Sequence, residues 1–173
     1  SFGSSHYGSK SCNLSLIGCT SFFPSKSLGC YGDGGAIFTN NKKLYLKMKM
    51  IRQHGQKKKY DYKTLGISAR LDTIQAVVLI EKLKLLDNEI KKRKKIHDYY
   101  CKELSKINKL KLLKIRDGNI SNYSVFPILV KKDRKNLIDY LNKNKIPTTI
   151  YYPKPLDRYK IFNNSLKKTT NAL

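Results

Sequence analysis

The chain has 173 residues, of which 40% are hydrophobic and 10% aromatic, so it has enough apolar material for one packed domain or for part of a larger one. Its 36 Lys and Arg residues outnumber its 12 Asp and Glu residues and give a formal net charge of +24. The sequence has no run of about 18 apolar residues, and it does not open on a charged segment followed by an apolar one. The composition therefore argues against a disordered tail, and we expect neither a membrane span nor a signal peptide.

The positive charge is spread over nearly the whole chain, with denser runs at Lys57–Lys59 and at residues 91–95. A strongly basic chain can bind polyanions by neutralising phosphates, but charge that forms a binding patch should cluster. Lys, Asn, Ile and Tyr are all abundant and share A/T-rich codons, which accounts for the bias. We therefore expect no nucleic-acid partner, although a basic polyanion-binding module stays open as an alternative function.

The cysteines and histidines do not follow the spacing of a metal site. No Cys-x-x-Cys pair occurs, and the three histidines are scattered. We expect no metal and four reduced, mostly buried thiols in a cytoplasmic protein. The four are Cys12, Cys19, Cys30 and Cys101.

The first predicted elements are two strands that flank a glycine-rich turn. Residues 15–23 combine Leu, Ile, Cys and Phe and predict a short buried strand that ends at Pro24. Four glycines follow within a few residues, and residues 36–39 predict the next strand. Glycine permits the backbone conformations that fold the chain back, so the two strands are expected to be neighbours.

A first helix is predicted over residues 42–51, with Asn40 or Asn41 as its N-cap. Three apolar residues recur in it at helical spacing. A polar, lysine-rich loop is expected over residues 53–68. The three apolar positions are Leu44, Met48 and Ile51.

A long second helix is predicted to begin after Asp72 and to reach about Lys106. Asp72 precedes Gln75 by three residues, the spacing of a capping box. One stripe of apolar residues then follows the helical period. The stripe consists of Leu79, Leu83, Leu86 and Ile90.

The remaining sequence predicts strands at 110–113, 123–130 and 148–151, with a helix over 133–144 between the last two. Strands that alternate with helices indicate an α/β fold. The pattern changes to short strands after the long helix, and we expect a domain boundary near residue 90, within or just before that helix.

One lysine stands in a setting that suits an aldehyde cofactor. An amine that condenses with an aldehyde must be partly desolvated, and it needs hydroxyls and backbone amides nearby for a phosphate. Lys26 follows an aromatic strand end, near Ser21, Ser25 and Ser27 and ahead of the glycines. These features alone favour an ordinary exposed lysine beside a glycine-rich hairpin, so they do not assign the role.

Four segments, in order, add a resemblance to a known family. Residues 21–36 read Ser-Phe-Phe-Pro-Ser-Lys-Ser-Leu-Gly-Cys-Tyr-Gly-Asp-Gly-Gly-Ala, and residues 66–76 read Gly-Ile-Ser-Ala-Arg-Leu-Asp-Thr-Ile-Gln-Ala. Residues 51–55 read Ile-Arg-Gln-His-Gly, and residues 150–156 read Ile-Tyr-Tyr-Pro-Lys-Pro-Leu. Together they resemble the motifs of the DegT/DnrJ/EryC1/StrS family of nucleotide-sugar aminotransferases, which depend on pyridoxal 5′-phosphate (PLP).

The resemblance implies a fold-type I PLP-dependent transferase, like aspartate aminotransferase. Residues 1–89 would be the C-terminal part of the large, PLP-binding domain, and residues 90–173 most of the small C-terminal domain. Lys26 would be the catalytic residue that holds PLP as a Schiff base and moves a proton. Ser21 and Ser68 would bind the cofactor phosphate, although the family commonly has Asn at the position of Ser68.

The resemblance also implies a substrate site and partners. Arg70 matches an arginine that faces a sugar carboxylate in relatives acting on a nucleotide-linked 3-keto-glucuronate, and Tyr151 and Tyr152 lie where such relatives often have His-Tyr. The expected reaction moves an amino group, from glutamate, to a keto nucleotide sugar for polysaccharide synthesis such as that of O-antigen. The expected assembly is a homodimer with a shared site and no membrane association.

The resemblance leaves two further alternatives within the same fold. A PLP-dependent sugar dehydratase is one, but those relatives carry histidine in place of Lys26. A non-catalytic remnant is the other. The chain corresponds to about half of the family's usual length and lacks the aspartate that pairs with the cofactor ring, so we expect it to be inactive alone.

Overall fold

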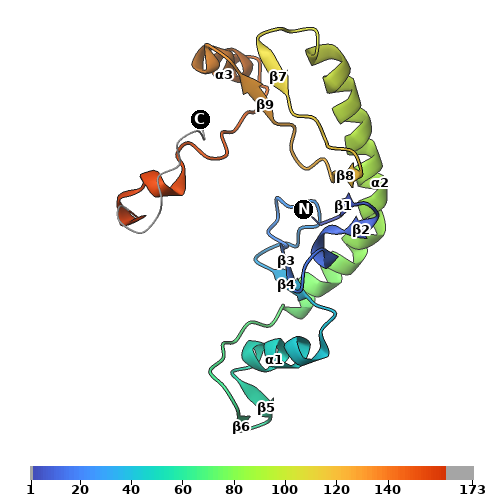
Figure 1. The fold of residues 1–173 in the computed structure, drawn as a ribbon, viewed down its shortest axis with the longest axis vertical. Coiled ribbons are helices and arrows are strands. Elements are labelled where there is room, and N and C mark those ends of the chain that lie inside the picture. Colours follow the sequence, from blue (N-terminus) through green and yellow to red (C-terminus); the bar gives the residue numbers. More distant parts are fainter. Residues whose placement is uncertain (1, 163–173) are drawn as a thin grey trace. The chain divides into compact units, whose positions relative to one another are not determined.

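The computed structural model describes residues 2–162 (Figure 1). The chain divides into two compact units between Leu129 and Val130. The first unit contains both long helices and the segments around Lys26, and the second contains one helix and two short 3-10 turns. Each unit is described by itself below.

The first unit is built around a hairpin of two short strands. Strand β3 (Gly18–Ser21) pairs antiparallel with β4 (Gly35–Phe38), with Ser21 opposite Gly35. The prediction of two neighbouring strands is confirmed, but the first is shorter than the expected 15–23 and only Gly18 in it is buried. The Ser15 hydroxyl donates to the Ile17 carbonyl at 2.8 Å, which bends the chain before the strand begins.

Helix α1 (Lys42–Arg52) follows the hairpin and confirms the predicted first helix. The side-chain oxygen of Asn41 accepts a hydrogen bond from the Leu44 backbone N–H at 3.1 Å, so Asn41 is the N-cap. The predicted apolar positions are half-buried, and no residue of α1 is fully buried. The helix therefore contributes only a weak apolar face to this unit.

The expected lysine-rich loop after α1 contains a small hairpin that the sequence did not indicate. Strand β5 (Gln56–Lys58) pairs antiparallel with β6 (Asp61–Tyr62), with an irregularity between Gln56 and Lys58. Tyr60 lies in the turn with a positive φ of 66°. These strands are too short and too polar for the alternation that predicts a strand.

Helix α2 (Thr73–Leu104) has 32 residues and runs without interruption, ending close to the predicted Lys106. Asp72 is at the N-cap position, but its side chain makes no capping hydrogen bond. The predicted capping box is therefore wrong. Gln75, its other member, instead accepts a hydrogen bond from the Tyr31 backbone N–H at 2.7 Å.

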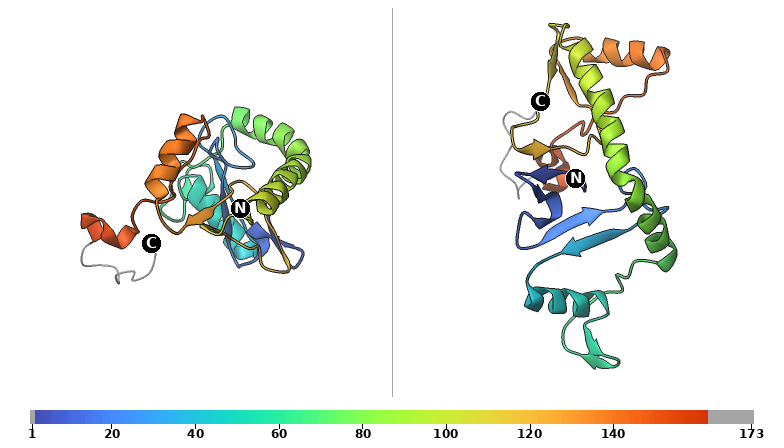
Figure 2. Two further views of the ribbon diagram at one scale, coloured as in Figure 1. Left: turned by 90° about the horizontal axis from the view of Figure 1, so that it is seen from above. Right: turned by 90° about the vertical axis from the view of Figure 1, so that its right-hand side faces the viewer.

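The core of the first unit joins α2 to the segment after β3. Five buried residues form it, and Leu71, Ile90, Phe2 and Ala36 pack against them. Figure 2 shows the β3–β4 hairpin beside the N-terminal half of α2. The predicted stripe on α2 is confirmed at three of its four positions, because Leu83 is 51% exposed. The five core residues are Phe22, Leu28, Cys30, Leu79 and Leu86.

Two small sheets complete the first unit. The order of one is β2 (Ser9–Lys10), β1 (Ser5–His6) and β8 (Asn119–Ile120), and a 3-10 turn at Ser11–Asn13 follows β2. In the other, β7 (Leu110–Leu112) pairs with β9 (Ile128–Val130).

Of the two strands predicted at 110–113 and 123–130, the first is confirmed and the second is shortened to β9. The Tyr123 N–H donates to the Ser121 hydroxyl, and the Ser124 N–H donates to the Asn122 side chain. These local hydrogen bonds replace those of a strand ladder.

The second unit contains α3 (Arg134–Lys143), which confirms the predicted helix over 133–144. The strand predicted over 148–151 does not form, because no other described segment pairs with it. Two 3-10 turns follow at Leu156–Arg158 and Lys160–Phe162.

The expected domain boundary at residues 89 and 90 falls within the continuous helix α2. The division of the chain into domains at that point stays a prediction. Among the described residues, no helix has the length and apolar character that crossing a membrane requires. Of the four free cysteines, Cys30 alone is buried, which corrects the expectation of mostly buried thiols.

Candidate active site

The Lys26 segment begins with a tight turn directly after β3. The Lys26 backbone N–H donates to the Phe23 carbonyl at 2.9 Å, which closes a four-residue β-turn with Pro24 at its second position. Proline suits this position because its ring fixes φ near the required value. The turn therefore sets where the Lys26 side chain leaves the backbone, and that side chain is exposed.

Cys30 ties the two limbs of this segment together. Its N–H donates to the Phe22 carbonyl at 2.8 Å, and its thiol lies 3.0 Å from the same carbonyl and 3.1 Å from that of Gly32. Phe22 in turn donates its N–H to the Gly34 carbonyl at 2.7 Å. Cys30 is fully buried. We call residues 22–34 the lysine loop, and its backbone is held by its own hydrogen bonds.

Ser21 is the last residue of β3 and lies just before the turn that ends at Lys26. Its hydroxyl accepts a hydrogen bond from the Phe23 N–H at 3.2 Å and is exposed. The hydroxyl proton of Ser21 is therefore still available for an anion. The role of Ser21 in binding the cofactor phosphate stays a prediction.

The residues of the lysine loop fit an aldehyde cofactor that carries a phosphate. The Ser27 hydroxyl is buried and has no hydrogen-bond partner among the described residues, so a polar group at this point would satisfy it. No carboxylate of residues 2–162 forms an ion pair with Lys26, so its amine is available. The desolvation expected for this amine is not supplied by these residues, and it stays a prediction for the whole protein.

A second group of site residues lies where two of the motif segments pair. The His54 N–H donates to the Ile67 carbonyl at 3.1 Å, and the Ala69 N–H donates to the Arg52 carbonyl at 3.1 Å. Ser68 lies opposite Gln53 in an isolated antiparallel bridge. This pairing brings the segments 51–55 and 66–76 side by side.

Gly55 allows this pairing. Its φ is +77°, and a Cβ atom placed there would lie 1.6 Å from the Thr64 carbonyl oxygen. Any side chain at this position would therefore collide with the backbone at Thr64, just before the second of the two segments.

A basic cavity of about 260 Å³ lies beside this pairing. Nη1 of Arg70 lies 3.3 Å from Nε2 of His54, so these two exposed side chains are in hydrogen-bond contact. No carboxylate lines the cavity, which makes it suited to an anion. Its lining residues are Gln53, His54, Gln56, Lys57, Lys58, Lys59 and Arg70.

The structure brings together only some of the predicted site residues. Ser21 and Lys26 lie on one segment, and Ser68 and Arg70 lie on another. The Tyr31 N–H of the lysine loop donates to the Gln75 side chain of the second segment at 2.7 Å, but no hydrogen bond or ion pair between described residues joins Ser68 or Arg70 to that loop. Their common role in one site stays a prediction.

Tyr151 and Tyr152 belong to the second unit and are 72% and 78% exposed. Their ring centroids are 5.8 Å apart in an edge-on arrangement. Their predicted contact with a substrate likewise stays a prediction.

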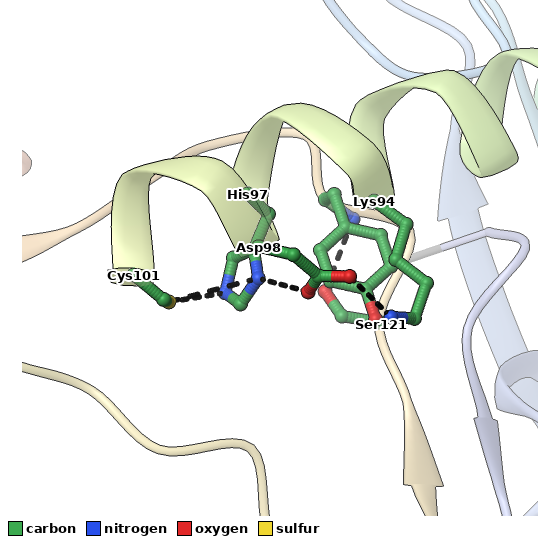
Figure 3. Close-up of polar contacts among 6 residues, drawn as sticks. Lys94, His97, Asp98, Cys101 and Ser121 are labelled. Carbon is green, nitrogen blue, oxygen red and sulfur yellow. Dashed lines mark hydrogen bonds and ion pairs between the residues drawn. The ribbon is translucent and has the colours of Figure 1, made fainter. Parts of the chain in front are cut away.

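A further polar cluster, which the sequence did not single out, lies in the C-terminal half of α2 (Figure 3). Nζ of Lys94 is 2.5 Å from Oδ2 of Asp98, and Nδ1 of His97 is 3.3 Å from Oδ1 of Asp98. The hydrogen bond to Lys94, followed by that to His97, lowers the pKa of Asp98. The hydrogen bond to Asp98 raises the pKa of Lys94. The His97 ring packs 4.9 Å from the Tyr123 ring, so the cluster joins α2 to the segment after β8.

Comparisons with known proteins show which proteins this chain is similar to. A UDP-2-acetamido-2-deoxy-3-oxo-D-glucuronate aminotransferase of Pseudomonas aeruginosa is 42% identical over 158 residues, which are 91% of this chain and 44% of that protein. The crystal structure of a DegT DnrJ EryC1 StrS aminotransferase from Brucella abortus matches with a TM-score of 0.90 and 36% identity, over 95% of this chain and 43% of that one. The chain thus spans less than half the length of these relatives.

Two other solved structures extend the comparison. NtdA from Bacillus subtilis, solved with bound cofactor PMP, matches with a TM-score of 0.73 and 28% identity, over 81% of this chain and 34% of that one. An Escherichia coli GDP-4-keto-6-deoxy-D-mannose-3-dehydratase with bound hydrated PLP matches with a TM-score of 0.76. It is 23% identical over 83% of this chain and 42% of that one, so it shows the common fold alone.

These matches define the class of the protein: the chain has the α/β fold of the PLP-dependent aminotransferases, which confirms the predicted fold class. The sequence model of one family, the DegT/DnrJ/EryC1/StrS aminotransferase family, matches residues 1–173. The chain belongs to that family, as its motifs indicated.

Proposed function

We propose that the protein to which this chain belongs transfers an amino group to a keto nucleotide sugar with PLP as its cofactor. The observation that carries the proposal is the lysine loop. It presents Lys26 from a hydrogen-bonded turn, within the motif that resembles the family's cofactor lysine. The 42% identity to an aminotransferase that acts on a UDP-linked 3-oxo sugar supports the reaction class.

PLP, when bound, supplies an electron sink for the carbon that gains or loses the amino group. Lys26 holds the cofactor through its amine and carries a proton to and from the reacting carbon. Ser21 and Ser68 donate hydrogen bonds to the cofactor phosphate. Ser68 has a shorter side chain than the Asn that the family commonly has at this position. Its contribution to phosphate binding is therefore smaller than that of Asn would be.

The basic cavity supports an anionic substrate. A planar guanidinium binds a carboxylate through two parallel hydrogen bonds, and that of Arg70 lies in hydrogen-bond contact with His54 at 3.3 Å. The relative from Pseudomonas aeruginosa is named for a 3-oxo-glucuronate, which bears such a carboxylate. We therefore assign the sugar carboxylate to Arg70, with Tyr151 and Tyr152 beside the substrate and glutamate as the amino donor.

The same proposal includes the assembly and its setting. The chain spans less than half of its relatives, and its own residues leave Lys26 exposed. We propose that the rest of the protein, a cytoplasmic homodimer with a site shared between its subunits, covers Lys26. The product serves polysaccharide synthesis such as that of O-antigen.

The dehydratase alternative has the weaker support. The dehydratase structure shares the fold at 23% identity, and the lysine at position 26 disfavours that chemistry. One observation supports the polyanion-binding alternative: Lys57–Lys59 line the basic cavity. It predicts retention on nucleic acid that falls steeply with salt and does not change in Lys26→Ala.

Borohydride trapping tests the function. The whole protein is incubated with PLP, reduced with borohydride and digested, and the labelled peptide is identified by mass spectrometry. We expect the label on Lys26, no label in Lys26→Ala, and normal labelling in the exposed-lysine control Lys84→Ala. A label on another lysine, or amino transfer that survives in Lys26→Ala, would contradict the proposal.

A further inference from the structure

A second lysine, Lys82, contacts the lysine loop from helix α2. Lys82 lies on α2, and its Nζ atom donates to the Gly29 carbonyl at 2.5 Å in a partly buried contact. The same ammonium lies 5.6 Å from the centroid of the Tyr31 ring. No carboxylate of residues 2–162 forms an ion pair with it. One cation of α2 therefore contacts two residues of the lysine loop.

The setting of Lys82 differs from that of an ordinary lysine on a helix. Lys84, two residues further along α2, is exposed and pairs with Glu81 at 2.7 Å. Lys82 is instead partly withdrawn from water without a carboxylate partner, which is unfavourable unless other groups replace the lost hydration. A charge-assisted hydrogen bond to a carbonyl and the face of an aromatic ring supply that replacement. The lysine loop thus holds the Lys82 ammonium in place, and the ammonium in turn restrains the backbone of the loop at Gly29.

Gly29 links this contact to the turn that carries Lys26. It is buried, and a Cβ atom there would lie 2.7 Å from the carbonyl oxygens of both Phe23 and Pro24. Those two residues begin the turn that the Lys26 N–H closes. A shift of Gly29 would therefore displace the turn, and with it the direction of the Lys26 side chain.

We propose that Lys82 is a positioning residue for Lys26, acting through the Gly29 carbonyl and the turn at Phe23 and Pro24. Gln75 assists it from the same helix, because it holds the Tyr31 N–H at 2.7 Å. Lys82 does not touch the cofactor in this role. The inference rests on the proposed function, since it requires Lys26 to bind PLP.

The test compares substitutions at Lys82 in the whole protein. Lys82→Met keeps most of the length of the side chain but removes the donor and the charge. We expect it to weaken the apparent affinity for PLP by about tenfold, as for loss of one charge-assisted hydrogen bond, and to slow borohydride trapping on Lys26. Lys82→Arg keeps a charged donor and should restore both quantities to within about twofold of the unaltered protein.

Two controls separate positioning from a general loss of structure. Lys84→Met removes a neighbouring charge and should leave PLP affinity and trapping unchanged. Far-UV circular dichroism reports whether each variant is folded, and Lys82→Gln replaces Lys82→Met if the latter is not, with the same expected loss.

The outcomes also separate this inference from the proposed function. Unchanged affinity and trapping in a folded Lys82→Met or Lys82→Gln protein would overturn the role of Lys82, as would an equal loss in Lys84→Met or a failure of Lys82→Arg to restore binding. The unaltered protein serves as the test of the function itself. If borohydride does not label its Lys26, the function fails, whatever the Lys82 variants do.

Discussion

Nη1 of Arg70 lies 3.3 Å from Nε2 of His54, although the two residues are 16 positions apart in the sequence. A guanidinium can only donate hydrogen bonds, so Nε2 of His54 is the acceptor in this contact. The contact ties the guanidinium to one wall of a cavity whose other cations are three lysines. The contact links two exposed side chains that both line the basic cavity.

Replacement of Arg70 tests its assignment to a sugar carboxylate. Arg70→Lys keeps the charge but loses the forked pair of donors. We expect the KM for a keto nucleotide sugar with a carboxylate to rise about tenfold, as when a charge-assisted hydrogen bond is lost. Steady-state kinetics with the whole protein measure the change.

A substrate without the carboxylate is the control for this prediction. Its KM should be the same in Arg70→Lys and in the unaltered protein. Equal increases for both substrates would mean that Arg70 contacts another part of the molecule.

The Lys94–Asp98 pair predicts a pH dependence of stability. The pKa of Asp98 is lowered in the folded chain, mainly by the hydrogen bond to Lys94. A lowered folded-state pKa means that the stabilisation is present above the ordinary value of 3.8 and is lost as pH falls through the folded-state value. Asp98→Asn should therefore lower Tm slightly at neutral pH, and this difference should vanish in strong acid.

Asp87→Asn is the matched control, because Asp87 is exposed on the same helix and forms no ion pair with another described residue. It should leave Tm unchanged at both pH values. A difference between Asp98→Asn and the unaltered protein that persists in acid would show that the pair does not act through charge.

Sequence patterns within a few residues predicted where the helices lie. They did not predict which tertiary contacts the residues near the helix N-termini make. The start of α1 followed from the two asparagines before it, of which Asn41 is the cap, and its bond to the Leu44 N–H is contained within four residues. Gln75 had the same local spacing from Asp72, yet it hydrogen-bonds to Tyr31, 44 residues away. A capping box and a tertiary contact compete for one side chain, and only the folded chain decides between them.

The strands and the second part of the candidate site were harder to predict for the same reason. Strands β5 and β6 are short, polar and stabilised by pairing with each other, so they lack a hydrophobic period. The Arg70–His54 contact depends on the register in which segments 51–55 and 66–70 pair. Lys82 looked like any other helix lysine, because its partner is a backbone carbonyl that carries no sequence signal.

The apolar stripe of α2 offers a direct comparison of sequence pattern with structure. Leu86 is buried in the core, whereas Leu83 of the same predicted stripe is 51% exposed. Leu86→Ala should reduce the free energy of unfolding by about 2–5 kcal/mol, and Leu83→Ala by about 0.5 kcal/mol or less. Urea unfolding of the whole protein measures both. Similar losses at the two positions would mean that Leu83 is covered in the assembled protein.

Gly29 gives the most local test of the lysine loop. In Gly29→Ala the new methyl group would lie 2.7 Å from two backbone carbonyl oxygens, which cannot move as a flexible side chain can. We expect a loss of about 1–3 kcal/mol in the free energy of unfolding, as for overpacking in a core, together with weaker PLP binding.

Gly32→Ala in the same loop is the control, because its methyl group would approach only the Gln75 side chain, at 3.2 Å. The contact is with Nε2, so a small shift of that atom can make room while Oε1 keeps the Tyr31 N–H, and the variant should keep most of its stability and its PLP affinity. If Gly29→Ala binds PLP as tightly as Gly32→Ala does, the turn that carries Lys26 does not depend on the close approach of Gly29.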